Sequence, residues 1–78
     1  MSKREIDKSR TLTKRYTNGN RKYVRDYDAD GMLVRERWWY SNGKRAWVYE
    51  YGVDGKPVRE REWDWDGKLT TDWKAGDE

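Results

Sequence analysis

Apolar and polar residues alternate along most of this chain, with the period of two that is typical of strands with one buried face. The alternation is interrupted every twelve residues by a glycine that follows an Asn or Asp, namely Asn18, Asp30, Asn42, Asp54 and Asp66. Asx-Gly between alternating segments is the strongest short-range signal for a β-hairpin. The spacing therefore predicts successive hairpins joined by two-residue type I′ turns.

A period of twenty-four residues lies over the period of twelve. Residues 16–39 and 40–63 are identical at 13 of 24 positions, and residues 64–75 resemble half of a third unit. No segment has a convincing helical period. The pattern predicts an all-β fold, a single-layer, twisted antiparallel meander of five to six strands. We divide the chain into a basic N-terminal arm at 1–12, expected to be flexible, a β-repeat domain at 13–75 and a tail at 76–78.

Two-residue turns would place one set of side chains on each face of the sheet. The first set, which we call the Trp38 face, is mainly aromatic and contains Tyr16, Tyr23, Tyr27, Val34, Trp38, Tyr40, Trp47, Tyr49, Tyr51, Val58, Leu69 and Trp73. We expect two cross-strand ladders on it, one of Tyr23, Trp38 and Trp47, the other of Tyr27, Val34, Tyr51 and Val58. Nothing else in the chain is available to cover this face.

The opposite face, which we call the Trp39 face, carries mostly charged side chains. Its expected rows are Asp26, Arg35, Glu50 and Arg59, then Val24, Arg37, Val48, Arg61 and Asp72, with a small patch of Trp39, Ala46 and Trp63. Alternating charges across strands are typical of a solvated surface. The sequence thus predicts that the Trp39 face is exposed to water.

The amino-acid composition excludes several kinds of functional site. The chain has neither Cys nor His, so disulfides, thiolate chemistry and the usual zinc ligands are excluded. The Asp-rich turns lack the downstream Glu of a calcium loop, and no glycine-rich phosphate loop is present. No apolar run has the length of a membrane span. We expect a cytoplasmic protein that is not an enzyme and has no cofactor, no metal and no membrane association.

Aromatic residues supply much of the apolar material, with six Trp and six Tyr among 78 residues. Trp, Tyr and Arg are enriched at binding hot spots, and a large uncovered apolar face marks an interaction surface. We therefore expect a partner protein to be bound through Tyr23, Trp38, Tyr40, Trp47, Tyr49 and Trp73. Homodimerisation through the same face is an alternative.

The distribution of charge supports a second alternative, binding of single-stranded nucleic acid. Residues 1–25 hold nine basic and two acidic side chains, a balance of +7, within a total of +3. Aromatic side chains interleaved with arginines can stack single-stranded nucleic acid, and a basic arm can contact phosphates. The residues for this alternative are Lys3, Arg4, Lys8, Arg10, Lys14, Arg15, Arg21, Arg25 and Arg45. Acidic residues on the Trp38 face, including Glu36 and Glu62, favour the protein partner.

The repeated units resemble MORN-variant repeats of the bacterial YwqK type. The resemblance covers residues 16–69 through Tyr16, Asn18, Gly19, Tyr40, Asn42, Gly43, Lys44, Asp54, Gly55, Lys56, Asp66, Gly67 and Lys68. The second glycine that often precedes a Trp in that family is missing here. The resemblance implies an open sheet of stacked hairpins and an antitoxin or immunity role. We expect a small inhibitor of this kind, including a phage counter-defence (anti-CRISPR) factor.

Overall fold

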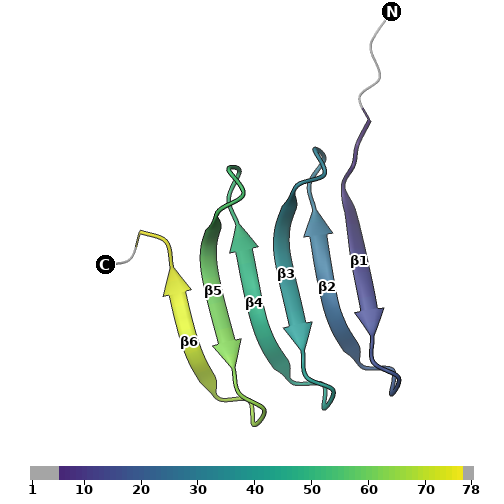
Figure 1. Ribbon diagram of the computed structural model, residues 1–78, viewed down its shortest axis with the longest axis vertical. Coiled ribbons are helices and arrows are strands. Elements are labelled where there is room, and N and C mark those ends of the chain that lie inside the picture. Colours follow the sequence, from purple (N-terminus) through teal and green to yellow (C-terminus); the bar gives the residue numbers. More distant parts are fainter. Residues whose placement is uncertain (1–5, 77–78) are drawn as a thin grey trace, which may run out of the picture.

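The structure, a computed structural model, describes residues 6–76 and forms one antiparallel sheet of six strands in sequence order (Figure 1). The strands are β1 (Arg10–Arg15), β2 (Arg21–Tyr27), β3 (Leu33–Trp39), β4 (Arg45–Tyr51), β5 (Pro57–Trp63) and β6 (Leu69–Lys74). The described residues contain no helix, and the sheet is only 10 Å thick. The predicted single-layer meander is confirmed. Its first strand begins at Arg10, inside the segment assigned to the arm.

The five turns differ from the predicted type I′ geometry. In the first, the Gly19 amide donates to the Tyr16 carbonyl and the Tyr16 amide donates to the Asn20 carbonyl, so the loop has three residues. Among the described residues only glycines have positive φ, with Gly19 at 91°. This is the pattern of a type I turn followed by a left-handed glycine. Asn18 instead uses its side chain to accept the Asn20 amide, and Asn42 and Asp54 do the same in their turns. In the other two turns the acceptor is the Asp two residues earlier, Asp28 or Asp64, which accepts the amide of Asp30 or Asp66.

A second irregularity follows each turn. Opposite β2, the pairing passes from Tyr27↔Leu33 to Asp26↔Arg35, which leaves Val34 as an extra residue in β3. Equivalent bulges fall at the same point of every hairpin, at Lys22, Val34, Ala46, Val58 and Thr70. A bulge bends the strand and increases its twist. The predicted ladder of Tyr27, Val34, Tyr51 and Val58 is therefore wrong, because Tyr27 faces Leu33 and Tyr51 faces Pro57.

The predicted register holds in the central part of the strands. Tyr23 faces Trp38, which faces Trp47 on its other side. The row of Asp26, Arg35, Glu50 and Arg59 also forms as expected. Within it Arg35 makes an ion pair with Asp26 at 3.2 Å, and Arg37 reaches the same carboxylate at 3.5 Å.

The buried core lies on the Trp39 face, contrary to the prediction that this face is solvated. The five buried apolar residues of the described chain are Val24, Trp39, Ala46, Val48 and Trp63. Four arginine side chains lie over the two tryptophans of this core, as two equivalent pairs 24 residues apart. Arg21 and Arg37 lie over the Trp39 ring at 4.1 and 5.8 Å, and Arg45 and Arg61 lie over the Trp63 ring at 4.4 and 5.6 Å.

These arginines act as the second layer that the sheet lacks. A guanidinium over an indole ring gains cation–π attraction, and the aliphatic stem of an arginine covers apolar surface while its head stays in water. The Nε atoms of Arg37, Arg59 and Arg61 are buried, which shows that these side chains lie flat on the sheet. Charged residues on this face therefore cover the core, and the Trp38 face remains open.

Candidate functional site

A continuous row of aromatic rings crosses the middle of the Trp38 face. Tyr23 of β2, Trp38 of β3 and Trp47 of β4 stand at directly paired positions, and Tyr49 follows Trp47 along β4. Successive ring centroids lie 4.7, 5.1 and 6.3 Å apart, and the two indoles are stacked at an interplanar angle of 24°. All four side chains are half-buried. The row is therefore partly accessible to solvent.

Glu36 holds one side of this row in place. Its carboxylate accepts hydrogen bonds from the Trp38 indole and the Arg25 guanidinium, each at 3.1 Å, and from the Tyr51 hydroxyl at 2.9 Å. Arg25 in turn covers the Tyr23 ring at 4.5 Å. Burial alone would raise the pKa of Glu36, but these hydrogen bonds and the Arg25 charge hold it below the usual value. The carboxylate is thus charged at neutral pH and fixes the orientation of its three donors.

A second carboxylate fixes the other side. The Tyr49 hydroxyl donates to Glu62 at 2.9 Å. Burial and this hydrogen bond raise the pKa of Tyr49 to about 12, and burial together with Glu36 does the same for Tyr51. The sequence had placed Glu36 and Glu62 on this face only as charges that repel phosphate. Their role as acceptors was missed, although pairing of residue 36 with 25 and 49 in the predicted register was the available signal.

Two of the six predicted partner-binding residues stand apart from this row. Tyr40 lies at the β3–β4 turn, where its hydroxyl donates to the Trp63 carbonyl at 2.8 Å and its ring contacts Trp65 at 5.3 Å. Trp73 lies on the edge strand β6 opposite Glu60 and is 43% exposed. Tyr23, Trp38, Trp47 and Tyr49 therefore form the compact site.

The predicted nucleic-acid residues are divided between the two faces. Arg25 is on the Trp38 face, as expected, but Arg21 and Arg45 cover the Trp39 and Trp63 rings on the other face. The bulges cause this change, since the extra residue shifts the alternation and pairs Arg45 with Trp39. Leu69 changes face for the same reason and pairs with Trp63.

The remaining basic residues follow the first strand. Arg10 covers the Tyr27 ring at 5.0 Å, Lys14 faces Tyr23 in the sheet, and Arg15 donates to the Gly19 carbonyl at 2.9 Å. Lys8 precedes β1, and its amide donates to Ala29 at 2.9 Å. Lys3 and Arg4 lie outside the described residues. Residues 8–15 thus form a basic sheet edge, which adjoins the aromatic row where Lys14 pairs with Tyr23.

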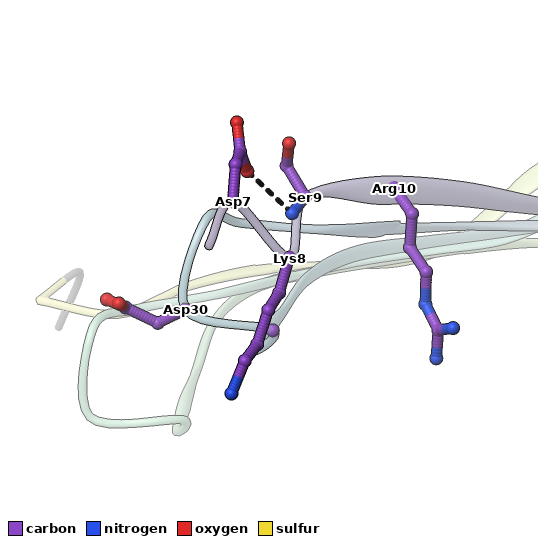
Figure 2. A pocket seen from close by; sticks show the side chains of 6 residues that line it. Asp7, Lys8, Ser9, Arg10 and Asp30 are labelled. Atoms are coloured by element: carbon purple, nitrogen blue, oxygen red, sulfur yellow. Dashed lines mark hydrogen bonds between the residues drawn. The ribbon is translucent and has the colours of Figure 1, made fainter. Parts of the chain in front are cut away.

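A hollow of about 510 Å³ lies at this basic edge beside the β2–β3 turn (Figure 2). Figure 2 shows Lys8 and Arg10 pointing to one side and Asp7 and Ser9 to the other. Ser9 lowers the pKa of the Asp7 carboxyl, first through its side chain and then through its backbone amide, which donates to the carboxylate at 2.8 Å. All its lining residues are exposed and it has no apolar wall. These are the features of a solvated surface, whereas small-molecule sites are enclosed and mostly apolar.

Residues 6–76 contain no cluster of three or more carboxylates that could hold a metal ion. Over the same residues, no helix is long and apolar enough to cross a membrane.

The bond between Tyr51 and Glu36 gives a pH-dependent test of the site. A raised tyrosine pKa favours the folded state below about pH 10, and this stabilisation is lost as pH rises toward 12. In an absorbance titration of phenolate, Tyr51→Phe should remove a transition near pH 12. Glu36→Gln should move that transition to lower pH, because the nearby negative charge is gone. Glu50→Gln, on the Trp39 face, is the control, and an equal shift in it would contradict the assignment.

No protein-family model matches the chain, and neither does any curated protein or solved structure.

Proposed function

We propose that this protein is a small, non-enzymatic binding module whose Trp38 face occludes a partner protein by stoichiometric binding. The observation that carries the proposal is the row of Tyr23, Trp38, Trp47 and Tyr49, half-buried within one layer and covered by no other described segment. Such a module acts as an inhibitor, antitoxin, immunity protein or phage counter-defence factor in the cytoplasm. The MORN-variant resemblance of the repeats supports the same class.

Pre-organisation supports binding through this row. Hydrogen bonds to Glu36 and Glu62 restrict Trp38, Tyr49 and Tyr51 before any partner arrives. Ordering side chains at an interface costs about 0.5–1.5 kcal/mol for each flexible one, so rings that are already fixed bind with a smaller loss of entropy. Stacked indoles also present a large rigid surface, and Trp and Tyr dominate binding hot spots.

Charge on the Trp38 face favours a protein over a nucleic acid. Glu36 and Glu62 flank the aromatic row, and Glu60 lies beside Trp73 on the same face. A phosphate backbone laid along the rings would approach these carboxylates. The main positive charge lies elsewhere, on the edge formed by β1 and over the Trp39 face. Of the three arginines that the alternative places among the rings, only Arg25 lies on the Trp38 face, while Arg21 and Arg45 cover the Trp39 face.

A salt titration tests this choice. We expect oligo(dT) to bind weakly at all salt concentrations. We also expect the triple variant Lys8→Gln, Arg10→Gln, Lys14→Gln to capture a protein from a cell lysate as well as the unmodified chain does. Substitution is preferable to removing residues 1–12, because Arg10 to Leu12 belong to β1. Tight oligonucleotide binding that falls steeply with salt and disappears in the triple variant would contradict the proposal, since phosphate contacts release counterions. The remaining alternative is a homodimer that buries the Trp38 face. Sedimentation of the Leu12→Lys variant tests it, because that variant lacks a free β1 edge and any dimer that it forms must use another surface.

A further inference from the structure

The two outer strands of the sheet, β1 and β6, each have a neighbour on one side only (Figure 1). All six residues of β1 are exposed, as are five of the six in β6. The unpaired amides and carbonyls along an open edge are a template for another strand, and proteins usually shorten, cover or bend such edges. Here both edges have the length of a full strand, and no other described segment lies beside them.

The repeat specifies what would fit between these edges. The pairing of β2 with β3 recurs as the pairing of β4 with β5, and the residue pairs of these two seams are related by a shift of 24 residues. Val24↔Arg37 in the first seam corresponds to Val48↔Arg61 in the second, and Arg25↔Glu36 corresponds to Tyr49↔Glu60. A third seam would start at β6. The strand that would complete it has the place in the repeat that β1, β3 and β5 share, and β1 alone among these has an open outer side.

We propose that β6 of one copy pairs antiparallel with β1 of a second copy, in the register of the two internal seams, so that copies join head to tail into one continuous sheet. A further shift of 24 residues sets this register. It places Trp73 opposite Leu12 of the second copy and Asp72 opposite Thr13 of the second copy.

Apolar surface at the two edges is complementary in this register. Leu12 is 39% exposed and Trp73 is 43% exposed. They stand at opposite ends of one cross-strand row on the Trp38 face, whose inner members are Arg25, Glu36, Tyr49 and Glu60. The row thus ends in an uncovered apolar side chain on each side of the sheet. The head-to-tail junction brings these two side chains together and removes both from water.

Polar groups at the junction also find partners. Within the chain, the Thr11 hydroxyl donates to the Asp26 carboxylate across β1 and β2 at 2.9 Å. Thr13 of the second copy and Asp72 can form the same bond. Like edges do not match in this way, because pairing β1 with a second β1 would set Arg10, Lys14 and Arg15 against the same charges.

Hydrogen bonds from tyrosine hydroxyls beside the turns also follow the 24-residue repeat. Tyr16 donates to the Trp39 carbonyl at 2.7 Å, and Tyr40 repeats this contact with Trp63, 24 residues later. The next members of the two series are Asp64 and Arg15 of the second copy. The tyrosine hydroxyl of the internal seams is therefore absent at the junction, which depends on strand pairing and on the contact between Leu12 and Trp73.

The junction is heterologous, since it joins two different edges, and so it propagates instead of closing as a two-fold dimer. It leaves both faces of the sheet free. The inference is accordingly independent of the protein-binding role of the Trp38 face, and either one can fail without the other.

Cysteine cross-linking tests the junction cleanly, because the chain has no cysteine of its own. Leu12→Cys and Trp73→Cys chains are mixed in equal amounts and oxidised mildly. We expect the mixed disulfide dimer to exceed both homodimers by more than random pairing gives. A mixture of Trp73→Cys with Met32→Cys, an exposed turn position, should give only the random distribution. If the Trp73→Cys chain does not fold, Thr71→Cys with Lys14→Cys probes the same register.

Sedimentation velocity of the unmodified protein gives a second measurement. The average mass should rise with concentration, and Leu12→Lys alone or Trp73→Lys alone should abolish the rise, because each blocks one edge. Mixing these two variants should restore a 1:1 dimer, since each retains the edge that the other lacks. A monomer at all concentrations up to about 100 μM, a homodimer of either variant, or random cross-linking would overturn the proposal.

Discussion

Trp39→Ala should destabilise the folded state by about 3–5 kcal/mol, the cost of removing a large buried aromatic side chain. Trp39 is 8% exposed, and the guanidinium groups of Arg21 and Arg37 lie over its ring. A domain of this size has a total stability of the same order. Urea denaturation should therefore find the variant largely unfolded at 25 °C, and Trp63→Ala should behave in the same way.

Trp38→Ala provides the contrast from the neighbouring position. Its ring is half-buried on the open face and stacks on Trp47, so we expect a loss of about 1–2 kcal/mol, from an aromatic pair and part of the apolar burial. Equal losses at positions 38 and 39 would contradict the assignment of the core to the Trp39 face. Trp65→Ala, at a turn and 53% exposed, should cost about 1 kcal/mol or less.

Trp47→Ala should weaken binding of the captured partner protein by at least about 2 kcal/mol, which is about thirtyfold in the dissociation constant. Trp47 joins two members of the aromatic row, stacking on Trp38 and contacting Tyr49. Its loss removes the central part of the site and leaves the core beneath intact. Surface plasmon resonance with the immobilised variant should show that most of the change lies in a faster dissociation rate.

The matched control is again Trp65→Ala, which removes an indole of the same size outside the row. Circular dichroism must first show that both variants are folded. Partner binding that survives Trp47→Ala but is lost in Trp65→Ala would move the site to the Tyr40–Trp65 pair at the end of the sheet. Equal losses in the two variants would argue against a localised row.

The position of each strand could be predicted because its determinants are local. A glycine every twelve residues marks each turn, and the alternation of side chains between turns defines each strand. The same information was sufficient for the central register, including Tyr23 opposite Trp38 and Asp26 opposite Arg35. It was also sufficient to bring the aromatic row together, since directly paired side chains always share a face.

The turn type and the bulges could not be predicted from the same signals. An Asn-Gly or Asp-Gly pair is compatible with a two-residue loop and with a three-residue loop that ends in a left-handed glycine. The two loops differ by one residue of register. The bulge that follows each turn restores the register in the middle of the strand but shifts the residues beside the turn. This is why Arg21, Arg45 and Leu69 lie on the Trp39 face.

The sequence by itself thus determined the strands, their order and the pairing of their central residues, whereas only the tertiary structure decided which face is the core. A count of aromatic residues favours the Trp38 face, and a count of charges marks the Trp39 face as solvated. Burial depends instead on what covers each side chain. Long arginines at the bulges and on adjacent strands fold back over Trp39 and Trp63 and exclude water from them. The shorter acidic side chains beside Trp38 bond to the ring edges and leave the aromatic row half-buried.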